Sequence, residues 1–227
     1  ICFLFLLGLF LVEGKNKWWL LVATILSIIL AWGKNFMPVT HFFVDYIPLY
    51  NKFRAVSMTL VIAAVSMTLM AFLGLKAFLS ENADKTKNLR ALLWSTAIVG
   101  GICLLYALIP SLAGNFKSPM DSELFTSDFS FLQETMPLDR KALLQADALR
   151  SLILILLAAG ILWVKTIKKV SIKYIYPALI ILFLADVYPI GKRYLNDANF
   201  TNKPIGKNII RPTAADNFIL QDKTYFR

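Results

Sequence analysis

Six apolar runs, separated by short polar or charged segments, constrain this chain more than any other feature of its sequence. A helix needs about 20 apolar residues to cross the hydrocarbon core of a bilayer, where only helices and closed barrels satisfy every backbone polar group. Of the 227 residues, 58% are hydrophobic and 17% are charged, whereas a soluble domain is about half apolar and a quarter charged. The sequence therefore predicts an all-α, polytopic transmembrane helix bundle.

The predicted spans divide the chain into a membrane region at 1–190 and a polar tail at 191–227, which we expect to open a soluble domain. The first run is too short to cross a bilayer and is expected to be the end of a truncated helix. The chain begins with Ile1 inside that run, which indicates a piece of a longer protein rather than a signal peptide. Pro137 and Asp139 predict the start of the fifth helix, with Asp139 as its N-cap. The approximate spans are 1–12, 18–33, 55–75, 91–113, 148–164 and 174–190.

The segment 33–54 lies between two spans but is neither a tight turn nor a plain charged loop. It contains six aromatic residues, two prolines and the single histidine of the chain, and it ends in Lys52-Phe53-Arg54. Aromatic rings favour the headgroup level of a membrane, and cations there reach lipid phosphates. We therefore expect this segment to form an interfacial platform of loop and short helix.

Basic loops predict the orientation of the spans. The segment 165–173 carries four lysines and no acidic residue, and the segments 13–17 and 80–90 also carry more basic than acidic residues. Alternation of the spans puts all three on one side, which the bias of Lys and Arg towards the cytoplasm makes the inner side. The platform, the acidic stretch 115–147 and the tail are then expected outside.

Charged residues at the outer face are the candidates for chemistry. Lys52 and Arg54 flank a phenylalanine there, as a lipid-phosphate site requires. Arg150 offers either a planar fork of donors to a phosphate or a local ion pair with Asp147, three residues earlier on the same helix. His41 is more typical of a polar interfacial residue than of a catalytic base. The residues predict no catalytic group and no metal site, because no known nucleotide, zinc or serine-hydrolase motif is present.

Asp186 is the most informative acidic residue, because a charge inside an apolar segment is costly. It is either a solvated acid near a helix end, or it pairs with an arginine such as Arg150 or Arg54, or it faces a substrate cavity. Asp45 and Asp147 are the other acidic candidates at the outer face.

The formal charge of +10 would suggest nucleic-acid binding in a soluble protein. Here the cations flank apolar runs, so lipid phosphates and membrane orientation explain them. We expect membrane lipids as partners, and no nucleic acid.

Three stretches of the chain resemble the C-terminal membrane half of YfhO-type bacterial membrane proteins. They are YIPLYNKFRAVSMTLVIA at 46–63, RKALLQADALRSLILILLAAGILW at 140–163, and DVYPIGKRYLNDANF at 186–200 followed by PTAADNFILQDKTYFR at 212–227. That family is similar to the GT-C glycosyltransferases. The resemblance implies a multi-pass protein of the bacterial cytoplasmic membrane that transfers sugar from a polyprenyl-phosphate donor to a cell-envelope acceptor outside.

GT-C enzymes carry their catalytic acid on the first large outer loop, and this chain is expected to begin after that loop. No catalytic residue is therefore carried over, and Lys52, Arg54 and Arg150 are expected to hold the donor phosphate. The alternatives are a transporter or flippase for lipid-linked sugars or envelope polymers, and a non-catalytic membrane scaffold. The sequence does not define a cofactor, the sugar or the oligomeric state.

Overall fold

The computed structural model describes residues 1–48, 50–52, 56–81, 83–118, 121, 130–168, 170–200, 213–219 and 221. Over these residues the prediction of an all-helical chain is confirmed, since they contain helices, turns and loops but no strand. The α-helices are α1 (Cys2–Leu11), α2 (Lys15–Ala31), α3 (Met37–Tyr46), α4 (Leu60–Leu79), α5 (Lys85–Leu108), α7 (Ser130–Lys168), α8 (Ile172–Tyr194) and α10 (Ala214–Ile219). The 3₁₀ helices are η1 (Gly33–Phe36), η2 (Tyr50–Lys52), η3 (Val56–Thr59), η4 (Pro110–Ala113) and η6 (Asp197–Asn199).

Four helical segments among the described residues are long and apolar enough to cross a membrane: Ser57–Leu79, Lys85–Leu108, Glu134–Lys168 and Ile172–Asn199. A fifth is added if Lys15–Ala31 and Gly33–Tyr46, which are bent by 103° at their junction, form one span. The 17 residues of α2 measure only about 25 Å at 1.5 Å per residue, which is less than the roughly 30 Å of a bilayer core. The chain therefore has the helices of a multi-pass membrane protein.

At two prolines the helices end or begin elsewhere than the sequence predicts. The predicted span 91–113 already ends at Leu108, because Pro110 disfavours a helical conformation at Ile109 and begins the 3₁₀ helix η4. The helix predicted to start at Asp139 instead starts at Ser130 and runs through Pro137. A proline removes one backbone hydrogen bond, and in this helix of 39 residues the remaining bonds maintain the helical conformation on both sides.

The chain divides into two compact units, Ile1–Leu182 and Phe183–Arg227. In the second unit, Thr213 and Asp216 cap the start of α10 reciprocally. The backbone N–H and hydroxyl of Thr213 each donate to Asp216 Oδ2 at 2.7 Å, and the Asp216 N–H donates back to Thr213 Oγ1 at 3.3 Å. This arrangement satisfies backbone donors that a helix start otherwise leaves unpaired.

In the first unit, α1 crosses α4 at a pair of glycines. A Cβ added to Gly74 would lie 2.4 Å from Gly8 Cα, and one added to Gly8 would lie 2.4 Å from the Met70 carbonyl oxygen. Helices in lipid pack through small residues because little hydrophobic force drives them together. Among the small residues of α4, Ala63, Ser66, Ala71 and Gly74 are buried, whereas Ala64 is exposed.

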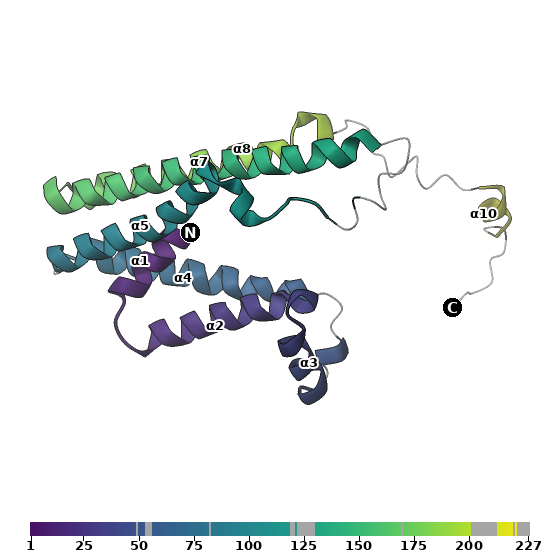
Figure 1. Cartoon of the computed structure of the whole chain (residues 1–227), viewed down its shortest axis with the longest axis horizontal. Helices are drawn as coiled ribbons and strands as arrows, with labels where there is room; N and C mark the ends of the chain where they lie inside the picture. Colours follow the sequence, from purple (N-terminus) through teal and green to yellow (C-terminus); the bar gives the residue numbers. More distant parts are fainter. Residues whose placement is uncertain are drawn as a thin grey trace. The chain divides into compact units, whose positions relative to one another are not determined.

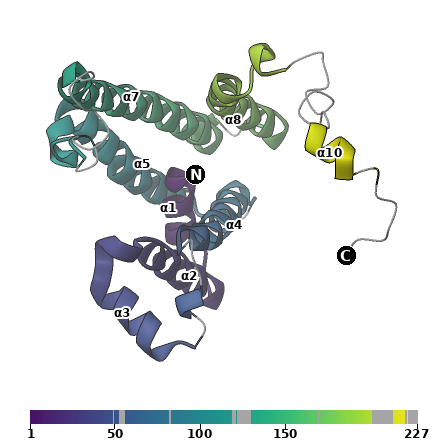
Figure 2. The ribbon, with the colours of Figure 1, turned by 90° about the vertical axis from the view of Figure 1, so that its right-hand side faces the viewer.

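Five helices contribute to the main apolar core of the first unit. Its buried residues are Phe3, Leu7 and Leu11 of α1, Phe78 and Leu79 of α4, Ala91 and Leu92 of α5, Ala159 and Leu162 of α7, and Ile175 of α8. Figures 1 and 2 show α1 lying between α4 and α5, with α7 beyond α5 and α2 on the other side of α4. The short helix α1 is therefore at the centre of the packing.

A hydrogen-bonded seam joins α2 to the start of α4. The Ser27 hydroxyl donates to the Thr59 carbonyl at 2.5 Å, accepts from the Ala63 N–H at 3.1 Å, and the Ser27 carbonyl accepts from Thr59 Oγ1 at 3.2 Å. One turn away, Thr24 Oγ1 lies 2.7 Å from Ser66 Oγ. These short polar side chains hold two otherwise apolar helices in one register.

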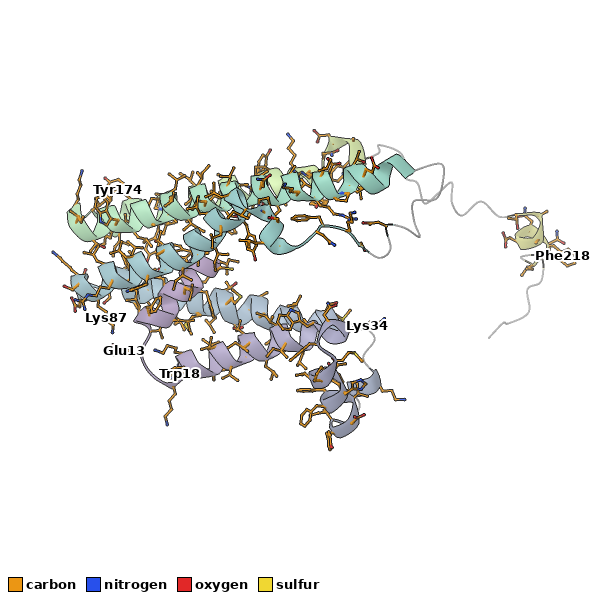
Figure 3. The ribbon with its side chains drawn as sticks, in the orientation of Figure 1. Glu13, Trp18, Lys34, Lys87, Tyr174 and Phe218 are labelled. Atoms are coloured by element: carbon orange, nitrogen blue, oxygen red, sulfur yellow. The ribbon has the colours of Figure 1, made fainter. Side chains whose placement is uncertain are left out.

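The first unit has two distinct ends. At the basic end, the α1–α2 and α4–α5 connections lie together, joined by the ion pair between Glu13 and Lys87, and α7 also ends there (Figures 1 and 3). At the platform end lie α3, the start of α4 and the end of α5, with Lys34 close by. The three basic segments therefore share one end, as alternation of the spans requires.

Candidate functional site

The platform end begins at a sharp change of direction after α2. Gly33 has a φ of +47°, a left-handed conformation that glycine adopts without steric cost. Pro38 lies in the first turn of α3, where its fixed φ favours a helix start. Thr40 Oγ1 donates to the Gly33 carbonyl at 2.8 Å and so fixes α3 against the turn. The bend of 103° is therefore built by local sequence.

The helix α3 presents aromatic rings to its surroundings. The side chains of Phe42 and Tyr46 are 55% and 75% exposed, and their rings lie 5.2 Å apart. Phe43 contacts Tyr50 of η2, with ring centroids 5.4 Å apart. A short helix that exposes rings beside charged residues has the composition of an interfacial element.

Of the predicted phosphate ligands, the structure places only Lys52 near this helix. Lys52 is the last residue of η2 and is exposed, and Asp45 is exposed on α3. His41, four residues before Asp45, is also exposed. Arg54 lies outside the described residues.

The remaining predicted site residues lie on α7 and α8. Asp147 is exposed and Arg150 is half-buried on α7, while Asp186 is half-buried on α8. Arg150 and Asp186 each have an interaction partner. Figures 1 and 2 show α3 and α7 on opposite sides of α4 and α5. Lys52 and Arg150 are therefore not on neighbouring helices, and each defines its own candidate location.

Sequence reasoning missed the best-formed ion pair near the start of α7. Arg140 Nη1 and Nη2 donate to the two oxygens of Asp121 at 2.7 and 2.8 Å, and Nη1 also donates to the Phe116 carbonyl at 2.8 Å. The Ser118 N–H donates to Asp121 Oδ2 at 2.8 Å. We call these four residues the α7 clamp, because they tie the segment after η4 to α7.

The α7 clamp shifts the ionisation of its acid. The hydrogen bonds from Arg140 and then from the Ser118 backbone lower the pKa of Asp121 to about 2, from an ordinary 3.8. Asp121 is almost fully buried, and Phe116 has a φ of +58°, which costs a non-glycine residue roughly 1 kcal/mol or more. Since the charge of Arg140 is already matched, this arginine serves the fold and is not a free phosphate ligand.

Little in the sequence identifies this pairing. Asp121 and Arg140 are 19 residues apart, with several other acids between 115 and 147. The spacing has no helical or strand period, so only the path of the chain brings the two side chains together.

The described residues contain no group of three or more His, Cys, Asp or Glu side chains that could hold a metal ion. Comparisons of the chain with protein-family models, with curated proteins and with solved structures gave no match.

Proposed function

We propose that this chain is the lipid-facing part of a membrane glycosyltransferase that takes sugar from a polyprenyl-phosphate donor at the outer face of a bacterial cytoplasmic membrane. The observation that supports this most directly is the platform: a short helix, bent by 103° from α2, with exposed rings and the exposed cation Lys52 beside it. A polyprenyl phosphate has a charged group at headgroup level and an isoprenoid chain below it. Such a lipid needs a cation next to exposed apolar surface.

In this proposal, Lys52 and Arg54 hold the donor phosphate on the platform, and Arg150, near the middle of α7, is a second candidate. Cations at these positions would stabilise the negative charge that develops on the leaving phosphate. Asp45, Asp147 and Asp186 are the acids available for pairing. The proposal assigns no catalytic residue to this chain.

The orientation is part of the proposal. The segments that contain Lys15, Lys87 and Lys165 lie at the basic end, so the bias of short basic loops puts that end in the cytoplasm. The platform then faces outwards, where lipid-linked sugars are used to build the envelope.

Sugar transfer in membranes tests the proposal. Membranes from cells with and without the full-length protein are supplied with radiolabelled polyprenyl-phosphate sugar, and label in envelope material is measured. We expect protein-dependent label that falls by about a hundredfold or more in Arg54→Ala and in Arg150→Ala, because each removes an ion that stabilises the leaving group. Lys141→Ala, an exposed residue also on α7, is the matched control and should leave transfer unchanged. Normal transfer by both arginine variants would contradict the phosphate-holding role.

The broken α2–α3 pair favours a second candidate, a transporter or flippase for lipid-linked sugars or envelope polymers. Interrupted helices are common at the substrate sites of transporters. In the same membranes, labelled lipid that changes leaflet without transfer of its sugar would establish this alternative. If neither transfer nor leaflet exchange depends on the protein, both the transferase and the transporter proposals are wrong, and the chain acts as a scaffold.

A further inference from the structure

A cavity at the basic end has a cationic surplus that the fold does not neutralise. It has a volume of about 240 Å³ and lies between the end of α4, the start of α5 and the end of α7. Lys85 and Lys165, which are 80 residues apart in the chain, both line it. Two ammonium groups that face one cavity repel each other, and this repulsion disappears when an anion binds between them.

The surroundings of these lysines leave their charge available. Lys165 is half-buried, and among the described residues neither Lys85 nor Lys165 forms an ion pair. In the part of the lining that the structure describes, Glu81 is the single acid, and it forms no ion pair with either lysine. The lining therefore carries two cations against one exposed anion.

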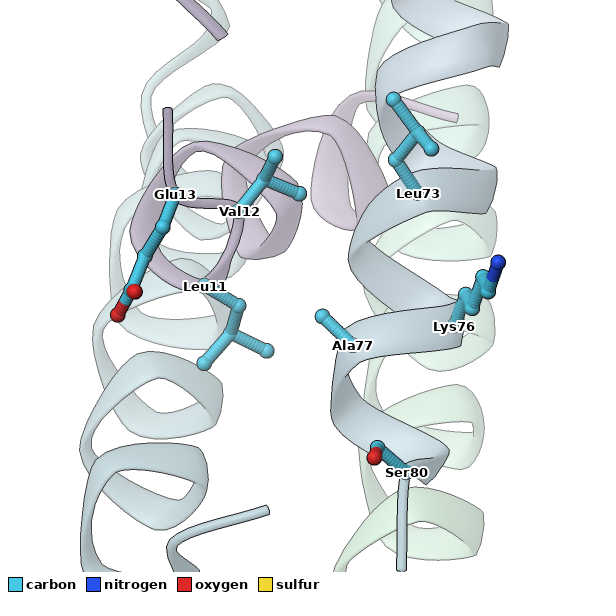
Figure 4. A pocket seen from close by; sticks show the side chains of 7 residues that line it. All are labelled: Leu11, Val12, Glu13, Leu73, Lys76, Ala77 and Ser80. Carbon is cyan, nitrogen blue, oxygen red and sulfur yellow. The ribbon is translucent and has the colours of Figure 1, made fainter. Parts of the chain in front are cut away.

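The neighbouring cavities at this end differ. The cavity in Figure 4, of about 350 Å³, has one acid and one cation, Glu13 and Lys76, which point away from each other, and its other walls are mostly apolar. A third cavity contains Lys87, Arg90 and Asp84; the ion pair of Lys87 with Glu13 leaves one cation, Arg90, beside one acid, Asp84. The surplus at Lys85 and Lys165 is thus a local property and does not follow simply from the basic composition of the end.

The walls of the cationic cavity are fixed in place. Asn88 is buried and donates its side-chain N–H to the Phe78 carbonyl at 2.9 Å, and Thr166 Oγ1 donates to the Leu162 carbonyl at 3.1 Å. Ser80 lines this cavity as well as the one in Figure 4, and its hydroxyl is a further hydrogen-bond donor. A volume below the roughly 300–1,000 Å³ of drug-sized ligand sites suits a small headgroup.

Exposed residues on α7 and α8 indicate the level of the membrane surface relative to the cavity. Trp163 and Ile167, each two residues from Lys165 on α7, are 52% and 54% exposed, and Tyr174 is 71% exposed. Tryptophan and tyrosine rings mark the headgroup level. Residues two apart on a helix face different sides, so Trp163 and Ile167 do not line the cavity, but they indicate that Lys165 lies at the headgroup level along α7.

We propose that this cavity binds the phosphate of an anionic phospholipid from the leaflet at the basic end. Lys85 and Lys165 supply the charge, Ser80 supplies a hydrogen bond, and the acyl chains run along the exposed side of α7. This site is separate from the platform and does not depend on sugar transfer.

Native mass spectrometry of the delipidated protein in detergent tests the site, with phosphatidylglycerol and phosphatidylcholine as probes. We expect a preference for phosphatidylglycerol that weakens by about thirtyfold in the double variant Lys85→Ala, Lys165→Ala, since each cation near a membrane surface contributes by a factor of about five. The matched control is Lys168→Ala, Lys173→Ala, which removes the same charge from exposed positions that do not line the cavity. It should change affinity less than about threefold.

A variant that binds more tightly is a control for misfolding, because a misfolded protein would lose affinity and not gain it. Glu81→Gln removes the single acid of the lining and should tighten phosphatidylglycerol binding by about fivefold. Equal losses in the cavity and control pairs, together with no gain in Glu81→Gln, would show a diffuse electrostatic effect and overturn the proposal. Inorganic phosphate distinguishes the source of the anion: if millimolar phosphate displaces the lipid completely, the site is one for a soluble anion and the lipid assignment is wrong.

Discussion

At the scale of single residues, the α7 clamp shows how one buried carboxylate organises a connection. The Asp121 carboxylate accepts hydrogen bonds from Nη1 and Nη2 of Arg140 and from the Ser118 N–H. Both of its oxygens therefore have hydrogen-bond donors, although the residue is almost fully buried. A bidentate pair of this kind has a defined geometry as well as a charge. The pair therefore fixes where the segment after η4 meets α7.

The pKa of Asp121 gives a prediction with a definite sign. Because the pKa in the folded chain is lowered from 3.8 to about 2, the clamp contributes its full stability above pH 4 and loses it as the pH falls towards 2. A ¹³C NMR titration of the Asp121 carboxyl should give a midpoint near 2 in the wild-type chain. In Arg140→Gln the midpoint should rise towards the ordinary value, and an unchanged midpoint would show that Arg140 is not the cause.

At the scale of elements, the crossing of α1 and α4 depends on the absence of two side chains. The added Cβ at Gly74 would lie 2.4 Å from Gly8 Cα, a backbone atom that cannot move without the whole helix. The glycines within α5 and α7 have no such constraint. A Cβ at Gly100 would meet Leu152 Cδ1 at an ordinary 3.5 Å, and one at Gly101 would meet nothing within 4 Å.

This difference predicts the effect of two matched substitutions. Gly74→Ala should lower the free energy of unfolding by about 1–3 kcal/mol, the usual cost of overpacking a core. Gly101→Ala should be neutral or stabilising by about 0.5–1 kcal/mol, because alanine favours a helix. Unfolding of both variants in detergent, followed by circular dichroism, measures the difference. Equal stabilities would mean that α1 does not pack on α4 in solution.

At the scale of the whole molecule, the grouping of the basic segments at one end predicts the orientation in the membrane. On a background in which Cys2 and Cys103 are replaced by serine, Lys34→Cys should react with a membrane-impermeant maleimide in intact cells. Lys173→Cys should react only after the membrane is permeabilised. These residues lie at the platform end and in the basic segment 165–173, respectively. The reverse pattern would put the platform in the cytoplasm and would remove the basis for a site for lipid-linked sugar at the outer face.

Sequence by itself determined that the chain is helical and suited to a membrane. An apolar run satisfies its backbone polar groups most simply within one helix, and this holds whichever neighbours it packs against. The bend into α3 is equally local, because Gly33 and Pro38 set backbone angles that few other residues favour. These features could be predicted because they depend on residues close together in the chain.

The tertiary structure decided the features that depend on distant residues. Only the packing selects Gly8 and Gly74 as a contact, pairs Asp121 with Arg140, and brings Lys85 and Lys165 to one cavity. The start of α7 at Ser130 also escaped prediction, because a proline is a weak stop within a long helix. Contacts of this kind depend on which helices become neighbours. The periodicity of residues within one helix does not identify the helix that it packs against.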